Sequence, residues 1–262
     1  MIKKSEFKNI YEVLDKTIKQ VFGSAKKNSQ PGDYLLFLAG ADKNDTPSGT
    51  KIPYVFDYQV DEWNMDSRIQ FLEMYLNNNY FSSAFPTTDT PISLTFELLL
   101  YMQIWGEKSF LKKLHRLAAL CNGGKYVWDV SIPEFGMPDF IEKIITSFKG
   151  NELEIAKIMD NTYLPQIRNA AAHDEYRLSN CNSIVFLNYK GKEKQIQEET
   201  FNDWTKRFTT TFLLEYHLFN EFVRQREKTS CNFPFPCTLK DKNGNDYRGT
   251  IIYNGQKFEI QG

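Results

Sequence analysis

The chain has 262 residues and a formal net charge of −1, and 41% of its residues are hydrophobic. Such a chain suits one large domain, or one domain with an appendage, built around a substantial core. The near-zero charge excludes a bulk positive field that would gather nucleic acid, so any RNA contact must depend on a local patch.

The spacing of apolar residues predicts a succession of helices through the first 150 residues. These helices are expected over residues 5–29, 61–79, 91–105, 107–121 and 138–149. Residues 34–39 fit either a strand or a helix, and residues 54–58 fit a short strand or a packed loop. Residues 40–53 are rich in Gly, Pro, Asp and Lys, which predicts a mobile loop.

The second part of the chain mixes helical and strand patterns. Residues 151–176 predict one or two helices, because Pro165 removes a backbone donor and must kink or restart the helix. The apolar run at 184–189, followed by Lys-Gly-Lys, predicts a small β-hairpin. The longest helix is expected over residues 199–228.

The carboxyl-terminal residues predict a small β appendage, so we divide the chain into a helical domain (1–230) and an appendage (231–262). Two Asn-Gly pairs within 238–260 are strong turn signals and predict three short antiparallel strands. A sheet this small needs support, which we expect from the long helix at 199–228. Its packed face is expected to consist of Ile251, Tyr253, Phe258 and Ile260.

The cysteines and the apolar runs bear on compartment and cofactors. The four cysteines are Cys121, Cys181, Cys231 and Cys237. Only the last two are close in sequence, and their spacing is too wide for an ordinary zinc pair, so we expect reduced cysteines, no metal and no cofactor. The amino-terminal lysines precede no apolar signal core, and no apolar run is long enough to cross a bilayer. We therefore expect a cytoplasmic protein with no membrane partner.

The most informative segment carries three polar residues that suit phosphodiester chemistry: Arg168, Asn169 and His173, joined by three alanines. Arginine matches phosphate oxygens with a fixed fork of donors, and histidine exchanges protons near neutral pH. On a helix, Asn169 and His173 share a face, whereas Arg168 and His173 lie about 140° apart. Arg168 and His173 can therefore line one groove only if the groove is wide or the helix end is distorted. We predict catalytic roles, and the alternative is a polar cluster that closes a helix end.

Several other polar residues are candidates for supporting roles. Asp174 is placed to orient the imidazole, and Tyr176 is expected to pack as an anchor at the helix end. His217 is expected at the edge of the core or in an interface. A basic group around His115 predicts a solvated face, with contact to an RNA backbone as the alternative. The candidate RNA contacts in that group are Lys112, Lys113 and Arg116.

The segment from Arg168 to His173 resembles the R-x4-6-H motif of HEPN domains. The residues that follow, from Asp174 to Arg177, are similar to the Ala-His-x-x-Tyr-Arg continuation of many members. The resemblance covers roughly residues 150–225, is looser upstream and is absent from the ends. It implies a mainly α fold: a HEPN-like helical bundle, here with a small β-hairpin insertion and a short carboxyl-terminal antiparallel β-sheet.

The same resemblance implies a function. Active members are metal-independent RNA endonucleases, often toxins or anti-phage defence effectors, which act as homodimers with two motifs facing a shared cleft. We therefore expect RNA as substrate, a second copy of the chain as partner, and an antitoxin or regulatory protein as a further partner. The alternative is a non-catalytic HEPN-like assembly module, or one that senses a nucleotide or a partner.

Overall fold

The computed structural model describes residues 2–43, 54–56, 58–77, 90–180, 182–229, 234–241, 243–253 and 258–261. Within these ranges the protein is mainly helical and carries small antiparallel sheets. Parts of several predictions lie outside the described residues. These are most of the loop at 40–53, the second Asn-Gly turn at 254–255, Cys181 and Cys231.

The helices follow the apolar periodicity of the sequence closely. They are α1 (Lys4–Asn28), α2 (Pro31–Leu38), α3 (Tyr58–Leu76), α4 (Pro91–Ile104), α5 (Lys108–Cys121), α6 (Met137–Lys149), α7 (Glu154–Thr162), α8 (Pro165–His173) and α9 (Phe201–Glu227). The predicted helices are confirmed to within a few residues at their ends. The ambiguous run at 34–39 belongs to α2, and Pro165 begins a separate helix as expected.

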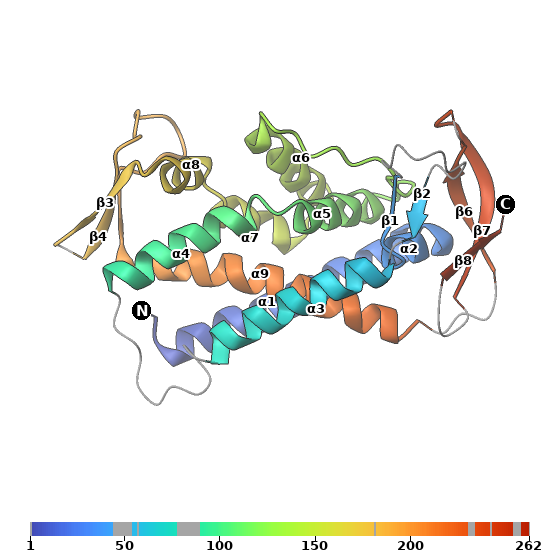
Figure 1. Ribbon diagram of the computed structural model, residues 1–262, viewed down its shortest axis with the longest axis horizontal. Helices are drawn as coiled ribbons and strands as arrows, with labels where there is room; N and C mark the ends of the chain where they lie inside the picture. Colours follow the sequence, from blue (N-terminus) through green and yellow to red (C-terminus); the bar gives the residue numbers. More distant parts are fainter. Residues whose placement is uncertain are drawn as a thin grey trace.

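The core is organised around α9, which contacts α1, α3, α4 and α7. In Figure 1, α1, α3 and α9 run along much of the length of the molecule, and α5 lies beside α1. Buried aromatic side chains recur along one face of α9 at helical spacing. They are Trp204, Phe208, Phe212, Phe219 and Phe222. The high aromatic content of the chain therefore serves the core. Among the described helices, none combines the length and apolar character needed to cross a bilayer.

Two small sheets lie in different parts of the molecule, the first beside α2 and the second near α8 (Figure 1). Strands β1 (Ala41–Lys43) and β2 (Tyr54–Phe56) pair antiparallel. Strands β3 (Tyr176–Ser179), β4 (Ser183–Phe186) and β5 (Glu198–Thr200) form a three-stranded sheet in that order. The small hairpin predicted here is confirmed, because β4 pairs antiparallel with β5 across a connection that contains Lys-Gly-Lys at 190–192. The buried run ends at Phe186, and β4 pairs with β3 before it and with β5 after it.

The carboxyl-terminal sheet contains β6 (Phe235–Lys240), β7 (Asp246–Tyr253) and β8 (Phe258–Gln261), as the sequence predicts. It lies at the opposite end of the molecule from the β3–β5 sheet (Figure 1). Of the four residues expected in its packed face, Ile251 and Phe258 are buried, and Tyr253 and Ile260 pack against the core. The predicted face is therefore confirmed.

The expected support for this sheet, the long helix, is wrong: β6 and β7 pack on α2. Gly32 permits this approach, because a Cβ atom on it would lie 2.0 Å from the carbonyl oxygen of Pro236. Asp33 Oδ1 accepts a hydrogen bond from the Thr238 amide at 3.2 Å, and Trp128 Nε1 donates to the Thr238 carbonyl at 2.8 Å. The position of the sheet therefore depends on this close backbone approach and on these hydrogen bonds. The spacing of apolar residues in the sequence contains no signal for either.

Candidate functional site

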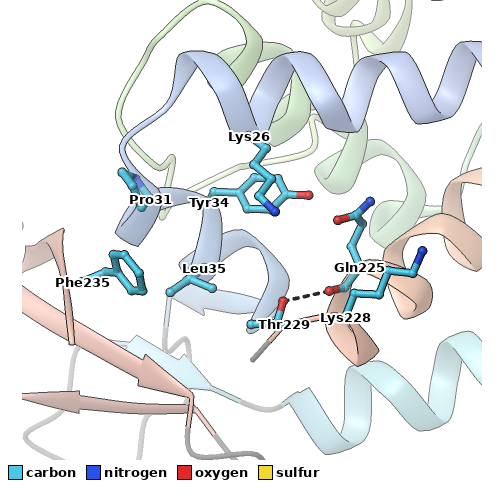
Figure 2. A pocket seen from close by; sticks show the side chains of 8 residues that line it. All are labelled: Lys26, Pro31, Tyr34, Leu35, Gln225, Lys228, Thr229 and Phe235. Atoms are coloured by element: carbon cyan, nitrogen blue, oxygen red, sulfur yellow. Dashed lines mark hydrogen bonds between the residues drawn. The ribbon is translucent and has the colours of Figure 1, made fainter. Parts of the chain in front are cut away.

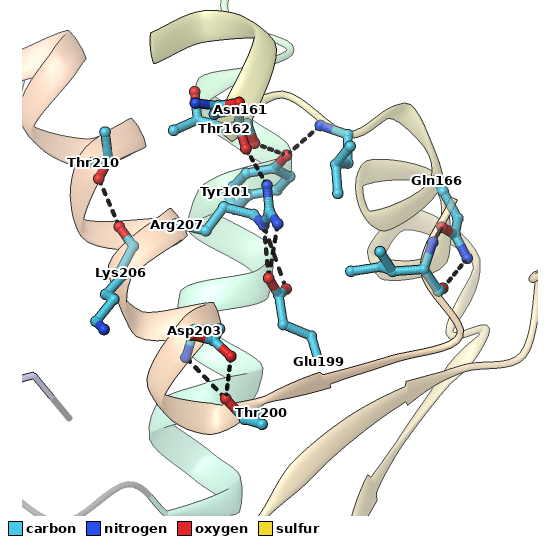
Figure 3. A network of polar contacts seen from close by, with 12 residues as sticks. Tyr101, Asn161, Thr162, Gln166, Glu199, Thr200, Asp203, Lys206, Arg207 and Thr210 are labelled. Atoms are coloured by element: carbon cyan, nitrogen blue, oxygen red, sulfur yellow. Dashed lines mark hydrogen bonds and ion pairs between the residues drawn. The ribbon is translucent and has the colours of Figure 1, made fainter. Parts of the chain in front are cut away.

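The hydroxyl of Tyr101 on α4 sets the position of α8. Tyr101 is fully buried, and its Oη donates a hydrogen bond to the Thr162 carbonyl at 2.7 Å. The same oxygen accepts a hydrogen bond from the Leu164 amide at 2.9 Å. Pro165 has no N–H to offer at this break, so one side chain pairs the backbone groups on both sides of it. Figure 3 shows this hydroxyl between the end of α7 and the start of α8.

A second polar anchor holds the first turn of α8 against the segment that leads into β5. The buried Gln166 side chain donates from Nε2 to the Ile196 carbonyl, and its Oε1 accepts from the Ile196 amide, both at 2.8 Å. Asn188 Nδ2 donates to the Gln166 carbonyl at 3.0 Å. Both partners of the Gln166 amide are backbone groups, so α8 has a fixed orientation relative to the 187–197 segment (Figure 3).

The end of α8 is a tight left-handed turn. Asp174 adopts φ 55° and ψ 35°, and the Glu175 amide donates to the Ala170 carbonyl at 2.9 Å, which is the Schellman pattern. Asp tolerates this conformation better than most residues. The chain then enters β3, where Tyr176 pairs with Phe186 and packs partly buried against the core. This packing is consistent with the expected role of Tyr176 as an anchor at the helix end.

The three motif residues all lie on α8 but face different surroundings. Arg168 is half-buried, whereas Asn169 and His173 are exposed. A Cβ atom placed on Gly106 would lie 3.9 Å from Arg168 Nη2, so the guanidinium lies beside the turn between α4 and α5. Among the described residues, no hydrogen bond joins His173 to Arg168 or to Asp174. The orienting contact expected from Asp174 is therefore not made, and the angular separation of the two catalytic candidates persists at the helix end.

Arg168 lies among buried polar atoms that have no partner within the described part of the chain. Its own Nε is one, and the others in this region are Trp105 Nε1 and Tyr163 Oη. The Trp105 and Tyr163 rings are in contact, with centroids 4.9 Å apart. Burial raises the pKa of Tyr163 well above its usual value, while the positive charge of Arg168 opposes that rise. Unpaired buried polar atoms cost stability, so this cluster calls for an explanation.

Neither Trp105 nor Tyr163 is predicted as a site residue from the sequence. Trp105 follows α4 and Tyr163 follows α7, so only the packing of these elements brings the two rings together. Tyr163 lies five residues before Arg168, but an aromatic residue ahead of a proline gave no chemical signal.

Much of the basic group on α5 is buried, so the solvated face expected there is wrong, while contact of these residues with RNA stays a prediction. Lys113 and Arg116 are each 6% exposed. Arg116 Nη2 binds Asp42 Oδ1 at 2.8 Å, and Lys112 Nζ binds Asp42 Oδ2 at 2.6 Å. Arg116 also donates to the carbonyl oxygens of residues 127 and 128. The carboxylate of Asp42, about 70 residues earlier in the chain, thus pairs with Lys112 and Arg116 and holds them against the fold.

The remaining histidines are structural. His115 is half-buried and stacks on Phe140 at 5.4 Å, and burial lowers its pKa. His217 is 5% exposed and meets the edge of the Tyr11 ring at 4.4 Å. The expected place of His217 at the core is confirmed.

A polar groove of about 610 Å³ lies next to α8, between α7, β5 and α9. Arg207, which lines this groove, is already paired. It donates to Glu199 at 2.8 Å and also to the Asn161 carbonyl (Figure 3). Burial raises the pKa of Glu199, and the charge of Arg207 opposes that rise. This ion pair ties α9 to β5 and α7, so its evident role is structural.

Comparisons with protein-family models, with curated proteins and with solved structures find no match for this chain. The site must be judged by its own chemistry. In the described residues no three His, Cys, Asp or Glu side chains gather as a metal site would require. The described cysteines, Cys121 and Cys237, are buried free thiols. The chemistry available around α8 is that of an arginine, an exposed histidine and unpaired hydrogen-bond donors.

Proposed function

We propose that the protein is a metal-independent RNA endonuclease of HEPN type, with its active site around α8. One observation carries the proposal. Arg168 is half-buried with an unpartnered Nε, five residues before an exposed histidine at the end of the same helix. The resemblance of the Arg168–His173 segment to the HEPN motif supports the same conclusion.

The side chain of Arg168 differs in its pairing from three other shielded arginines. Arg68, Arg116 and Arg207 are each paired with a carboxylate. No ion pair or hydrogen bond joins the Arg168 side chain to any residue that the structure describes. A buried guanidinium nitrogen without an acceptor is unfavourable, and a phosphate group supplies oxygens at the spacing of the guanidinium fork. The arginine is therefore prepared for an anionic ligand.

The proposed reaction is internal transesterification. The ribose 2′-hydroxyl attacks the adjacent phosphorus, the bond to the 5′-oxygen breaks, and a 2′,3′-cyclic phosphate remains. His173 acts as general base or acid in moving the protons. Arg168 stabilises the charge that develops on the phosphoryl oxygens. Asn169, exposed one turn before His173, contacts the phosphate or the imidazole.

Within one chain, Arg168 and His173 point in different directions from α8. In a dimer, Arg168 of one protomer and His173 of the other can face the same cleft. An apolar stripe on α4, the helix against which α8 packs, supports this assembly. Ile92, Phe96 and Leu99 follow helical spacing and are 83%, 47% and 47% exposed. Exposed apolar stripes of this kind mark interaction surfaces. We therefore place the two-fold contact of the proposed homodimer at α4 and α8.

The test is cleavage of total RNA by purified protein in the presence of EDTA. We expect cleavage by the wild type, with cyclic phosphate or 3′-phosphate ends, and a loss of about 100-fold or more in Arg168→Ala and His173→Ala. Arg248→Ala, an exposed arginine on β7 at the other end of the molecule, is the matched control and should cleave normally.

Equal cleavage by the wild type and both motif variants would reveal a contaminating nuclease and refute the proposal. A second outcome would favour the non-catalytic alternative: RNA or nucleotides bind the wild type, binding weakens in Arg168→Ala, and no cleavage occurs. The unpaired atoms of Trp105 and Tyr163 beside Arg168 would then be ligand contacts.

A further inference from the structure

A separate pocket lies far from α8, between α1, α2 and the end of α9 (Figure 2). Its volume is about 300 Å³, at the lower end of the range for small-molecule sites. The lining residues are Lys26, Pro31, Tyr34, Leu35, Gln225, Lys228, Thr229 and Phe235. The pocket shares no residue with the α8 site.

An unpartnered hydroxyl forms part of the wall of this pocket. Tyr34 is 4% exposed, and its Oη has no hydrogen-bond partner within the described chain. In Figure 2 this hydroxyl points from α2 into the space that faces the Gln225 side chain on α9. A buried phenol normally finds an acceptor, so a ligand oxygen would remove an energetic cost here.

The charges around the pocket are positive and uncommitted. Lys26, near the end of α1, and Lys228, after α9, have no ion pair with any described residue, and none of the described residues that line the pocket carries a carboxylate. Glu221 on α9, whose charge acts on the Tyr34 hydroxyl, is already paired with Arg224 and accepts a hydrogen bond from Gln225. The pocket therefore favours an anion, and two ammonium groups suit a doubly charged phosphate better than a carboxylate.

The remaining lining is apolar. Pro31, Leu35 and Phe235 lie on the side of the pocket formed by α2 and β6. Figure 2 shows the Phe235 ring and the Leu35 side chain on this side, away from Gln225 and Lys228. A ring packed against Phe235 and Leu35 would gain from burial and from aromatic contact. The pocket thus combines a flat apolar half with a cationic half.

We propose that this pocket binds a small phosphate monoester that carries a flat ring. Its phosphate lies between Lys26 and Lys228 and accepts a hydrogen bond from Tyr34, and its ring packs against Leu35 and Phe235. Gln225 supplies a further polar contact beside the phosphate. This assignment does not depend on the function proposed for α8, and it gives the protein a second site for a small ligand.

Isothermal titration calorimetry with phenyl phosphate and with adenosine monophosphate tests the proposal. We expect at least one of them to bind with a dissociation constant on the order of 10–100 µM. Inorganic phosphate, adenosine and benzoate, which each lack part of the proposed chemistry, should bind at least tenfold more weakly. Equally tight binding of benzoate would refute the assignment of a phosphate.

Variants localise the binding. Lys26→Gln and Lys228→Gln change exposed side chains and should each weaken binding about tenfold, while Tyr34→Phe should weaken it several-fold. Lys27→Gln, an exposed neighbour outside the pocket, is the matched control and should bind as the wild type does. If Tyr34→Phe does not fold, the two lysine variants still decide. Absence of binding at 1 mM of both phosphates, or unchanged binding in both lysine variants, would overturn the proposal.

Discussion

Replacing Tyr101 by Phe removes one oxygen atom from the centre of the molecule and leaves two buried backbone groups unpaired. The Leu164 amide loses its acceptor at 2.9 Å, and the Thr162 carbonyl loses its donor at 2.7 Å. Each unsatisfied buried group costs about 1–3 kcal/mol, so for two groups we expect the free energy of unfolding to fall by about 2–6 kcal/mol. In a chain of this size that corresponds to a melting temperature lower by about 4–24 °C.

Urea unfolding and thermal melts followed by circular dichroism measure this change. Tyr189→Phe is the matched control, because Tyr189 is 41% exposed, and it should stay within about 0.5 kcal/mol of the wild type. A Tyr101→Phe protein as stable as that control would refute the reasoning. It would mean that the break between α7 and α8 is held by packing alone, without the bridging hydroxyl.

Two further predictions concern acid stability and assembly. Burial lowers the pKa of His217 to about 4 from an ordinary value of 6.5, although Asp15 opposes the shift. The unfolded chain therefore binds the proton first, and stability falls as the pH drops from about 6.5 to 4. Between pH 7 and pH 5 the loss is about 2 kcal/mol. Urea titrations should show that His217→Phe lacks this loss, and an unchanged pH dependence would contradict the assignment. For assembly, Phe96→Asp should convert the proposed dimer to a monomer in light scattering and lower the proposed RNA cleavage. Phe135→Asp, which changes a side chain that is 90% exposed, should do neither. A wild type that is monomeric at micromolar concentration would rule out the dimer.

Local patterns predicted the parts of the fold that depend on local physics. Helix periodicity gave the helices, and the missing N–H of Pro165 gave the break before α8. The alternation of apolar and polar residues in the last strands predicted the buried face around Ile251 and Phe258. These features need only neighbours within one or two turns, or across one hairpin.

Features that depend on distant residues were not predictable in the same way. The basic group on α5 looked like a surface because Asp42, which pairs with Lys112 and Arg116, is far away in sequence. The carboxyl-terminal sheet packs on α2 because Gly32 leaves room for the backbone at Pro236. At the candidate site, the motif residues were predicted, but their unpaired neighbours came only from packing.

The pairing of α1 with α9 has a consequence for the order in which the protein forms. The apolar face of α1, with Leu14, Ile18 and Val21 fully buried, is covered by α5 and by a helix that begins about 170 residues after α1 ends. During synthesis, α1 therefore leaves the ribosome long before its second partner exists. Contacts of such long range slow folding and expose intermediates to aggregation. We therefore expect part of the apolar face of α1 to stay uncovered until α9 has emerged.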